Sequence, residues 1–265
     1  MQAICLIRDQ PHYRRAAFVD GLRAAGYSVA QNAQPQSARD LFVIWNRYGT
    51  SEARANAWEK DGGTVLVCEN GYAGRDAGGH QLYAISAHGH NGSGWHPVGD
   101  RDRFAERGIS VEAWRAPSPD GHILVCGQRG IGSRQMASPH GWHDRAAARL
   151  RKLFDHPVRI RPHPGNQPPA TPLETDFVNC YAVAIWSSAS GVRALLAGIP
   201  VIYDAPHWIL ASAATRLDAG AHEPLRDDAA RLAALRRMAW AQWTVDEIQS
   251  GEPFALFRDE AEQRK

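Results

Sequence analysis

Short apolar segments alternate with segments of helical periodicity along most of the chain, and this alternation limits the possible folds more than any other feature. In the first part of the chain, strand-like and helix-like segments alternate over residues 4–8, 13–26, 41–45, 51–60 and 64–70. The alternation resumes over residues 122–127, 142–154, 157–164, 179–186, 187–198 and 199–204. Strands that are separated by helices form parallel βαβ units, so the sequence predicts an α/β protein.

Residues 88–121 interrupt the alternation and predict a division of the chain. The segment 114–121, WRAPSPDG, contains two prolines and a glycine and fits a linker. A chain of 265 residues is long enough for two small domains. We therefore expect Rossmann-like domains over 1–115 and 122–240, with a C-terminal helix and tail over 241–265. Ligands of open α/β sheets bind at the carboxyl ends of the strands, so the site is expected in a cleft where the two domains face each other.

Composition excludes several classes of protein. Hydrophobic residues make up 44% and charged residues 22%, which is typical of a globular chain and not of a disordered or fibrous one. The formal charge is only +2, which excludes DNA binding by charge alone but leaves room for a local basic groove. The apolar runs are far shorter than the roughly 20 residues of a membrane-spanning helix. The N-terminus lacks the features of a signal peptide, which predicts a cytoplasmic protein.

Cysteine and histidine spacing does not indicate a metal site. The four cysteines lie in or beside apolar runs, which predicts buried thiols: Cys5, Cys68, Cys126 and Cys180. Two histidine pairs lack the acid or cysteine that would complete a ligand set: His88 with His90, and His140 with His143. We therefore expect neither a metal ion nor another bound cofactor.

The sequence CENG (68–71) follows a buried strand and holds a candidate catalytic acid. An acid followed by Asn-Gly is typical of a tight turn, which would project Glu69 from the edge of the sheet. A carboxylate in that position can accept the proton of an attacking hydroxyl. The alternative is an ordinary turn with a solvated acid.

The sequence RPHPG (161–165) places His163 between two prolines where a strand ends. Proline fixes its own φ angle, so the imidazole would be held rigidly and could donate a hydrogen bond to a phosphate. Arg159 and Arg161 share one face of the strand, and one of them could reach the same anion. The alternative is a structural histidine in a stiff turn.

Two further segments are candidate phosphate sites. In WSSASG (186–191), Ser187 and Ser188 stand where a buried strand gives way to a helix, whose N-terminal N–H groups attract anions.

The glycine-rich loop GQRGIGS (127–133) can offer backbone N–H groups around Gly130 and the charge of Arg129. It matches neither a P-loop nor a dinucleotide fingerprint. The alternatives are a helix cap for the serines and a flexible turn for the loop.

The order of the three short motifs, E-N-G, then H-P, then S-S, resembles that of the bacterial sialyltransferases and the related Kdo transferases. Those families are metal-independent, inverting glycosyltransferases of the GT-B architecture, with two facing Rossmann-like domains. The resemblance spans residues 60–205 through short motifs only, and the run from Gly191 to Val201 also resembles the donor-binding half of GT-B enzymes. Asn70 stands where those families have a second acid.

The resemblance implies a role for each motif. Glu69 is expected to be the catalytic base, His163 to contact the donor phosphate, and Ser187 and Ser188 to bind it. The domain over 1–115 would then bind the acceptor, and the domain over 122–240 would bind a nucleotide-sugar, the co-substrate. No metal is expected.

We therefore expect transfer of a sugar from a nucleotide-sugar to an acceptor hydroxyl, with inversion at the anomeric carbon. Two alternatives remain open at this stage. One is a binding protein that captures a nucleotide or sugar without catalysis. The other is a sugar epimerase or phosphorylase with the same two domains.

The acceptor is either a saccharide or other small molecule, or DNA with a hydroxymethylated base. The chain is small for this architecture and resembles phage-encoded enzymes that modify DNA in the host cytoplasm. Arginines near the predicted element ends could line the acceptor side and contact DNA phosphates: Arg8, Arg14, Arg15 and Arg47. The loop GHNGSG (89–94), with His90 and Asn91, is a second candidate for acceptor binding, or else a solvated loop. Asn70, which follows the candidate base Glu69, is a further candidate for acceptor binding.

Overall fold

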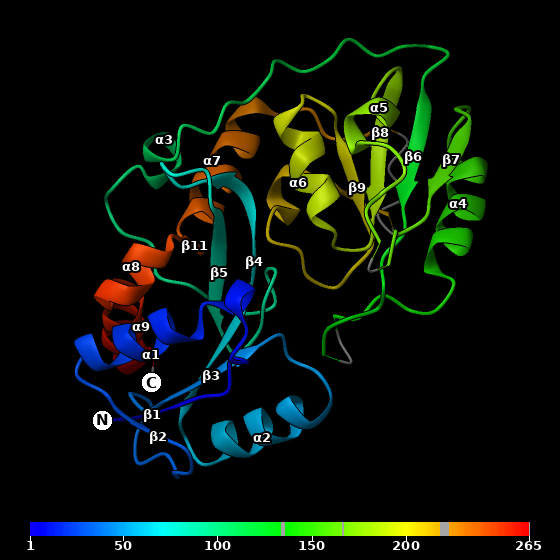
Figure 1. Ribbon diagram of the computed structural model, residues 1–265. Helices are drawn as coiled ribbons and strands as arrows, with labels where there is room; N and C mark the ends of the chain where they lie inside the picture. The colour runs from blue at the N-terminus through cyan, green and yellow to red at the C-terminus, as the bar shows by residue number, and fades with distance from the viewer. Residues whose placement is uncertain (134–135, 166, 218–222, 265) are drawn as a thin grey trace. The chain divides into compact units, whose positions relative to one another are not determined.

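The computed structural model describes residues 1–133, 136–165, 167–217 and 223–264. The chain forms two compact units (Figure 1). Unit 1 contains Met1–Gly108 and Arg236–Lys265, and unit 2 contains Ile109–Leu235. The C-terminal segment thus belongs to the same unit as the N-terminus.

Unit 1 is built on a six-stranded sheet of order β11-β5-β4-β3-β1-β2. The strands are β1 (Gln2–Cys5), β2 (Ser28–Ala30), β3 (Leu41–Trp45), β4 (Thr64–Arg75), β5 (Gln81–Ala87) and β11 (Gln242–Trp243). The pairs among β2, β1, β3 and β4 are parallel, whereas β5 is antiparallel to both of its neighbours. The apolar sequence of β3, LFVIW, fits a central strand that is buried on both faces.

Helices cover both faces of the unit 1 sheet. Helices α1 (Arg15–Ala24), α8 (Val245–Ser250) and α9 (Glu252–Gln263) lie over one face, where Phe18, Phe254 and Phe257 are fully buried. Helix α2 (Gly49–Lys60) covers β3 and β4 on the other face, where Trp58 stacks on Phe42. The short helices η1 (Pro11–Tyr13) and α3 (Arg103–Glu106) complete the unit.

Unit 2 is built on a five-stranded parallel sheet of order β10-β9-β8-β6-β7. The strands are β6 (His122–Cys126), β7 (Val158–Arg161), β8 (Cys180–Ile185), β9 (Val201–Tyr203) and β10 (Thr215–Arg216). Helix α4 (Trp142–Leu153) packs on one face, over Ile123 and Val125. Helix α6 (Ala189–Leu196) packs on the other, where Gly191 lies against Ile185. The described part of unit 2 also contains α5 (Leu173–Asp176), η2 (Ala211–Ala213) and α7 (Asp228–Ala239), whose last residues belong to unit 1.

The prediction of a tight turn at CENG is wrong. Strand β4 continues through this segment to Arg75, and Glu69 and Asn70 pair with Ala84 and Tyr83 of β5. The chain reverses later, near Asp76, whose backbone N–H bonds the carbonyl of His80. Asn-Gly can be accommodated in the strand because the antiparallel partner β5 supplies the hydrogen bonds that a turn would otherwise supply.

The residues near the C-terminus are more regular than the sequence indicates. The last ten or so residues are strongly charged, which predicts a frayed end. Instead, α9 extends to Gln263 and Ala261 is 5% exposed.

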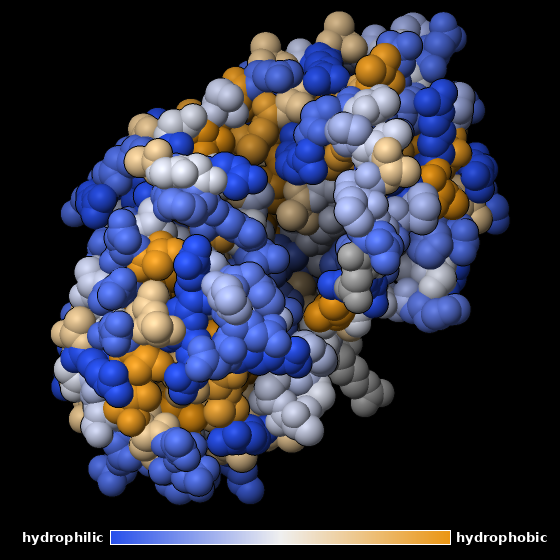
Figure 2. All heavy atoms as spheres, in the orientation of Figure 1, coloured by the Kyte–Doolittle hydropathy of each residue, from blue (hydrophilic) through white to orange (hydrophobic). Residues whose placement is uncertain are grey.

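Figure 2 shows a mainly hydrophilic face, with hydrophobic residues gathered over β1 and β2 of unit 1. None of the helices in the described part of the chain has the length and apolar character needed to cross a bilayer.

Candidate functional site

Three predicted segments of unit 2 come together because β8, β6 and β7 are neighbours in the parallel sheet. The serine pair follows β8, the glycine-rich loop follows β6, and the His163 turn follows β7. Parallel neighbours place their carboxyl ends at one edge of the sheet. The backbone N–H of Gly127 bonds the carbonyl of Arg161 at 2.8 Å, which holds the loop against the histidine turn.

A pocket of about 350 Å³ opens at this edge of the unit 2 sheet. Its polar lining comes from the predicted residues Arg161, His163 and Ser188, and from Ser190 and Arg193 of α6. Its other lining residues are mainly small or proline: Cys126, Gly127, Pro162, Pro164, Pro169, Pro172, Leu173 and Ala189. The pocket therefore combines hydroxyl, imidazole and guanidinium groups in one rigid cavity, which is suited to an anionic ligand.

The His163 imidazole is fixed by its own turn. Its Nδ1 atom accepts a hydrogen bond of 2.9 Å from the backbone N–H of Gly165. Burial, together with the positive charge of Arg129, lowers the pKa of His163 below its usual value. The ring is therefore neutral near pH 7 and carries its proton on Nε2, where it can donate to a ligand.

The two predicted serines have different surroundings. Ser188 is the N-cap of α6: its Oγ accepts from the backbone N–H of Ser190 at 3.2 Å and from the Ser190 hydroxyl at 2.7 Å. Ser187 is 3% exposed and is bracketed by Gln128, whose amide oxygen accepts from the Ser187 N–H and whose Nε2 donates to the Ser187 hydroxyl. Ser188 thus lines the pocket, while Ser187 attaches the glycine-rich loop to the start of α6.

The two arginines that line the pocket are ion-paired. Arg161 bonds the Asp176 carboxylate and Thr171, and its side chain is 16% exposed. Arg193 bonds Glu174 and is half-exposed. Arg161 therefore fixes the 171–176 wall of the pocket. Arg193 can turn to a ligand more easily, because its partner Glu174 is itself exposed.

The glycine-rich loop supplies further groups beside the pocket. Arg129 is exposed, and its charge reaches His163. Gly130 has a φ angle of 68°, a conformation that favours glycine, and an added Cβ would approach the Ser138 carbonyl oxygen to 2.9 Å. Gln128 and Ser190 lie in the two predicted segments, 127–133 and 186–191, but were not predicted as individual site residues, and Arg193 lies outside both segments. Ser190 and Arg193 could have been predicted from their i,i+3 spacing on α6, whereas no local pattern indicates that Gln128 contacts Ser187.

In unit 1, Glu69 belongs to a hydrogen-bonded cluster on β4. The Tyr72 hydroxyl donates to Glu69 Oε1 and accepts from the backbone N–H of Asn91 at 3.1 Å. Glu69 is partly buried, whereas Tyr72 and Asn91 are buried. Burial, followed by the charge of Glu69, raises the pKa of Tyr72 well above its usual value, so the hydroxyl remains a donor.

The other predicted acceptor-side residues lie in different surroundings. Asn70 is exposed and points to the opposite face of β4 from Glu69. His90 is 8% exposed, and its Nδ1 has no hydrogen-bond partner among the described residues. Arg14 interacts with the Tyr83 hydroxyl, on the α1 side of the sheet. The structure therefore links the backbone of Asn91 to Glu69 through the Tyr72 hydroxyl but places Asn70 on the other face.

The Arg47 guanidinium is hydrogen-bonded to groups within unit 1. Its guanidinium donates to both carboxylate oxygens of Glu59, to the amide oxygen of Asn56 and to the carbonyl of His88, and its side chain is 11% exposed. Burial of Glu59 opposes ionisation, but hydrogen bonds from His88 and Arg47 outweigh this effect and lower its pKa to about 2. Arg47 thus anchors the start of the 88–94 loop.

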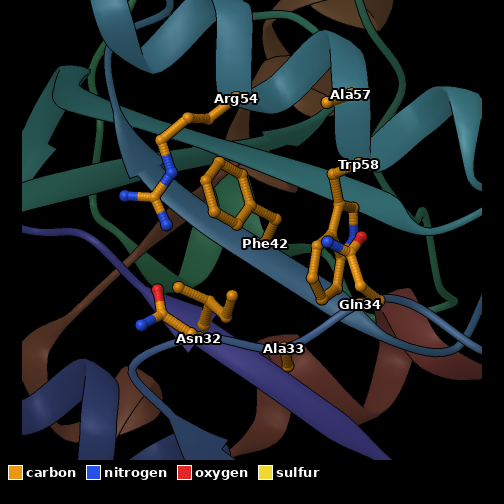
Figure 3. A pocket seen from close by; sticks show the side chains of 8 residues that line it. Asn32, Ala33, Gln34, Phe42, Arg54, Ala57 and Trp58 are labelled. Atoms are coloured by element: carbon orange, nitrogen blue, oxygen red, sulfur yellow. The ribbon is translucent and has the colours of Figure 1, made fainter.

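A second cavity, of about 580 Å³, lies beside α2 in unit 1 (Figure 3). Ile4 and Phe42 of the sheet, Arg54 and Trp58 of α2, and Asn32 and Gln34 from the connection after β2 line it. Figure 3 shows the Arg54 side chain beside the Phe42 ring. The Arg54 guanidinium carbon lies 5.4 Å from the ring centroid. The connection from β2 to β3 contains no helix over this part of the sheet, so the cavity is a part of the α2 face that no helix covers.

The four cysteines agree with the expectation of buried thiols. All four cysteines are free and buried. Across the described ranges, His, Cys, Asp and Glu side chains do not gather in threes around a point that could hold a metal ion.

Comparison with known proteins identifies a related fold. No protein-family model matches the chain, and no curated protein sequence matches it. Among solved structures, the β Kdo 2,7 transferase of Thermosulfurimonas dismutans KpsC is similar over 100% of this chain and 99% of its own, with a TM-score of 0.58 and 13% identity. The β Kdo 2,4 transferase of the same KpsC covers 91% of this chain and 89% of its own, with a TM-score of 0.46 and 12% identity. The predicted α/β fold class, with two parallel-rich, Rossmann-like sheets, is confirmed.

Proposed function

We propose that this protein is a metal-independent, inverting glycosyltransferase that moves a sugar from a nucleotide-sugar to an acceptor hydroxyl. The observation that carries the proposal is the unit 2 pocket, in which His163, Ser188 and Ser190 surround the N-terminus of α6. The whole-chain similarity to a β Kdo 2,7 transferase fold supports the same class of reaction.

The donor phosphate would bind in this pocket. The Nε2–H of neutral His163 would donate to a phosphate oxygen, since its Nδ1 is already occupied by the Gly165 N–H. The Ser188 and Ser190 hydroxyls and the first N–H groups of α6 would bind the same group. Arg129 and Arg193 would add positive charge, because both are at least partly exposed.

Glu69 would act as the general base. The acceptor oxygen attacks the anomeric carbon while its proton passes to the Glu69 carboxylate, and the bond from the anomeric carbon to the phosphate oxygen breaks. The electron pair of that bond leaves on the phosphate, where the His163 N–H and the serine hydroxyls stabilise the developing charge without a metal. A single displacement of this kind inverts the anomeric centre.

We propose a saccharide as the acceptor, and the surroundings of two arginines support this choice over DNA. Of the arginines that motivated a DNA acceptor, Arg47 is enclosed by Glu59, Asn56 and the His88 carbonyl, and Arg14 interacts with Tyr83. These guanidinium groups would have to leave their partners to bind DNA phosphates. The formal charge of +2 adds little attraction for a polyanion.

The test begins with donor binding and ends with product analysis. Thermal unfolding would be measured with CMP-, UDP-, GDP- and dTDP-sugars, because a ligand at 100 times its Kd adds about 2.7 kcal/mol to the free energy of unfolding. The stabilising donor would then be incubated with saccharides and with hydroxymethylated DNA, with and without EDTA. A sugar-sized mass increase of a saccharide in EDTA is the expected result. Transfer to DNA in place of a saccharide would contradict the proposed acceptor. If EDTA abolished transfer and a divalent ion restored it, the metal-free mechanism would be wrong. An epimerised donor without any transfer would overturn the proposed function.

A further inference from the structure

Tyr72 is held directly over the Glu69 carboxylate by an irregularity in β4. Cys68, Glu69 and Asn70 pair regularly with β5, and regular pairing resumes at Arg75. Residues 71–74 therefore lie opposite Leu82 alone, and β4 bulges there. In a regular strand, residues i and i+3 point to opposite faces, so the bulge is what allows the Tyr72 hydroxyl to reach Glu69.

Two features hold this bulge in place. The buried side chain of Gln242, from β11, accepts the backbone N–H groups of Tyr72 at 2.6 Å and Ala73 at 2.9 Å. Gly71 has no room for a side chain, because an added Cβ would lie 2.7 Å from the carbonyl oxygen of Leu82. Gln242 thus satisfies the two donors that the bulge removes from the ladder.

The Tyr72 hydroxyl has a defined direction of donation. It accepts the backbone N–H of Asn91, so its single proton is directed to Glu69 Oε1. Glu69 Oε1 is then occupied, and the second carboxylate oxygen is the one that can take a proton from a substrate. We infer that Tyr72 is the positioning residue of the catalytic base: its hydroxyl orients the Glu69 carboxylate. This inference rests on the proposed glycosyltransferase function.

In the described part of the chain, Tyr72 is the side chain that bonds the Glu69 carboxylate. Burial raises the pKa of the Tyr72 hydroxyl and of the Cys68 thiol well above their usual values, so both are neutral at physiological pH. Glu59 of α2 is bonded to Arg47 and to His88. Removing the Tyr72 hydroxyl should therefore free the Glu69 carboxylate to turn.

The experiment compares kcat and KM of Tyr72→Phe with those of the wild type in the full-length chain. Phenylalanine keeps the buried ring but removes the hydroxyl that holds Glu69 Oε1. The carboxylate can then turn away from the acceptor oxygen, so kcat should fall about 10- to 100-fold with an unchanged KM for the donor.

Tyr27→Phe is the matched control, because Tyr27 is also a buried tyrosine of unit 1 and its hydroxyl has no partner among the described residues. A second measurement compares Tyr72→Phe in the wild type and in Glu69→Gln: the effect should disappear when the carboxylate is gone. If the wild type transfers sugar and Tyr72→Phe leaves kcat unchanged, the role of Tyr72 is overturned and the proposed function stands. If the wild type transfers no sugar to any acceptor, the proposed function fails and this role fails with it.

Discussion

The Nδ1 atom of His163 accepts a hydrogen bond from the backbone N–H of Gly165, only two residues further along the chain. Pro162 and Pro164 stiffen the backbone on either side of the histidine. The φ angle of Gly165 is 69°, which favours glycine and turns its N–H back toward the ring. Five consecutive residues, RPHPG, thus specify both the place of the imidazole and its tautomer.

His163→Ala should weaken donor binding. The variant loses one hydrogen bond to a charged phosphate, which is about 1.5–3 kcal/mol, or about a 10- to 150-fold rise in Kd. Titration calorimetry with the stabilising nucleotide-sugar measures the change. His80→Ala is the control, because His80 lies in an exposed turn of unit 1. An unchanged Kd in a folded His163→Ala protein would return this histidine to a structural role.

Much of the unit 2 site could be predicted from the sequence because each of its segments is locally specified. The prolines on either side of His163 and the N-cap position of Ser188 can both be recognised from neighbouring residues in the sequence. Sequence order alone also places them near each other, since strands of a parallel sheet end at one edge. The partner of Ser187 could not be predicted, because Gln128 reaches it across 59 positions of the chain.

Ser188→Asp should distinguish the role of Ser188 as the N-cap of α6 from its role in binding the donor phosphate. Aspartate is a good N-cap and its charge favours the N-terminus of α6, so the free energy of unfolding should stay within about 1 kcal/mol of the wild type. The same charge would repel a donor phosphate, and donor binding should be lost. Thr244→Asp, at the N-cap of α8, is the control and should leave donor binding intact. Donor binding that survives Ser188→Asp would mean that the phosphate lies elsewhere.

Glu69→Gln should abolish most transfer and leave donor binding intact. Glutamine keeps the shape of the side chain but cannot take a proton, and general-base assistance contributes about 10²–10⁴-fold to the rate. Initial rates and donor affinity would be measured together. Glu52→Gln, in the first turn of α2, is the control. Near-normal turnover of Glu69→Gln would remove Glu69 from the mechanism.

The surroundings of Glu69 show where sequence reasoning fails. Asn-Gly predicts a turn from local preference, but β5 pairs with this segment and keeps it extended. Gly71 is needed for the close approach of Leu82 and not for a turn. The anchor of the bulge, Gln242, is 170 positions from Tyr72. No local pattern could have indicated a contact that depends on the C-terminal segment joining unit 1.

Gly71→Ala tests whether a glycine is required at position 71 for the close approach of Leu82. The added methyl group would collide with the backbone carbonyl of Leu82, which cannot move without breaking the β4–β5 pairing. Overpacking of this kind costs about 1–3 kcal/mol in the free energy of unfolding, which urea titration can measure. A loss below about 0.5 kcal/mol would show that the strands can part at this point.

Stability should fall in mild acid because of His96. Burial, and then the nearby charges of Arg237 and Arg264, lower its pKa to about 4, while its Nε2 bonds the carbonyl of Arg237 at 3.0 Å. Because the pKa of histidine in the unfolded chain is about 6.5, acid protonates the unfolded state first. The free energy of unfolding should therefore decrease as the pH falls from about 6.5 toward 4, by about 2 kcal/mol at pH 5.

The loss at Glu59 belongs to a lower range of pH. Its pKa is about 2 in the folded protein, so its contribution is complete above about 4.5 and is lost as the pH falls from there toward 2. Urea titrations at pH 7.5, 6 and 5 thus exclude Glu59. Burial also lowers the pKa of His122 and His163, so the share of His96 is the difference between the wild type and His96→Gln. His96→Gln keeps a donor for the Arg237 carbonyl but cannot be protonated, so it should flatten the dependence in this range. His207→Gln, at an exposed position, should leave the dependence unchanged. An equally steep loss in His96→Gln would assign the acid sensitivity to other groups.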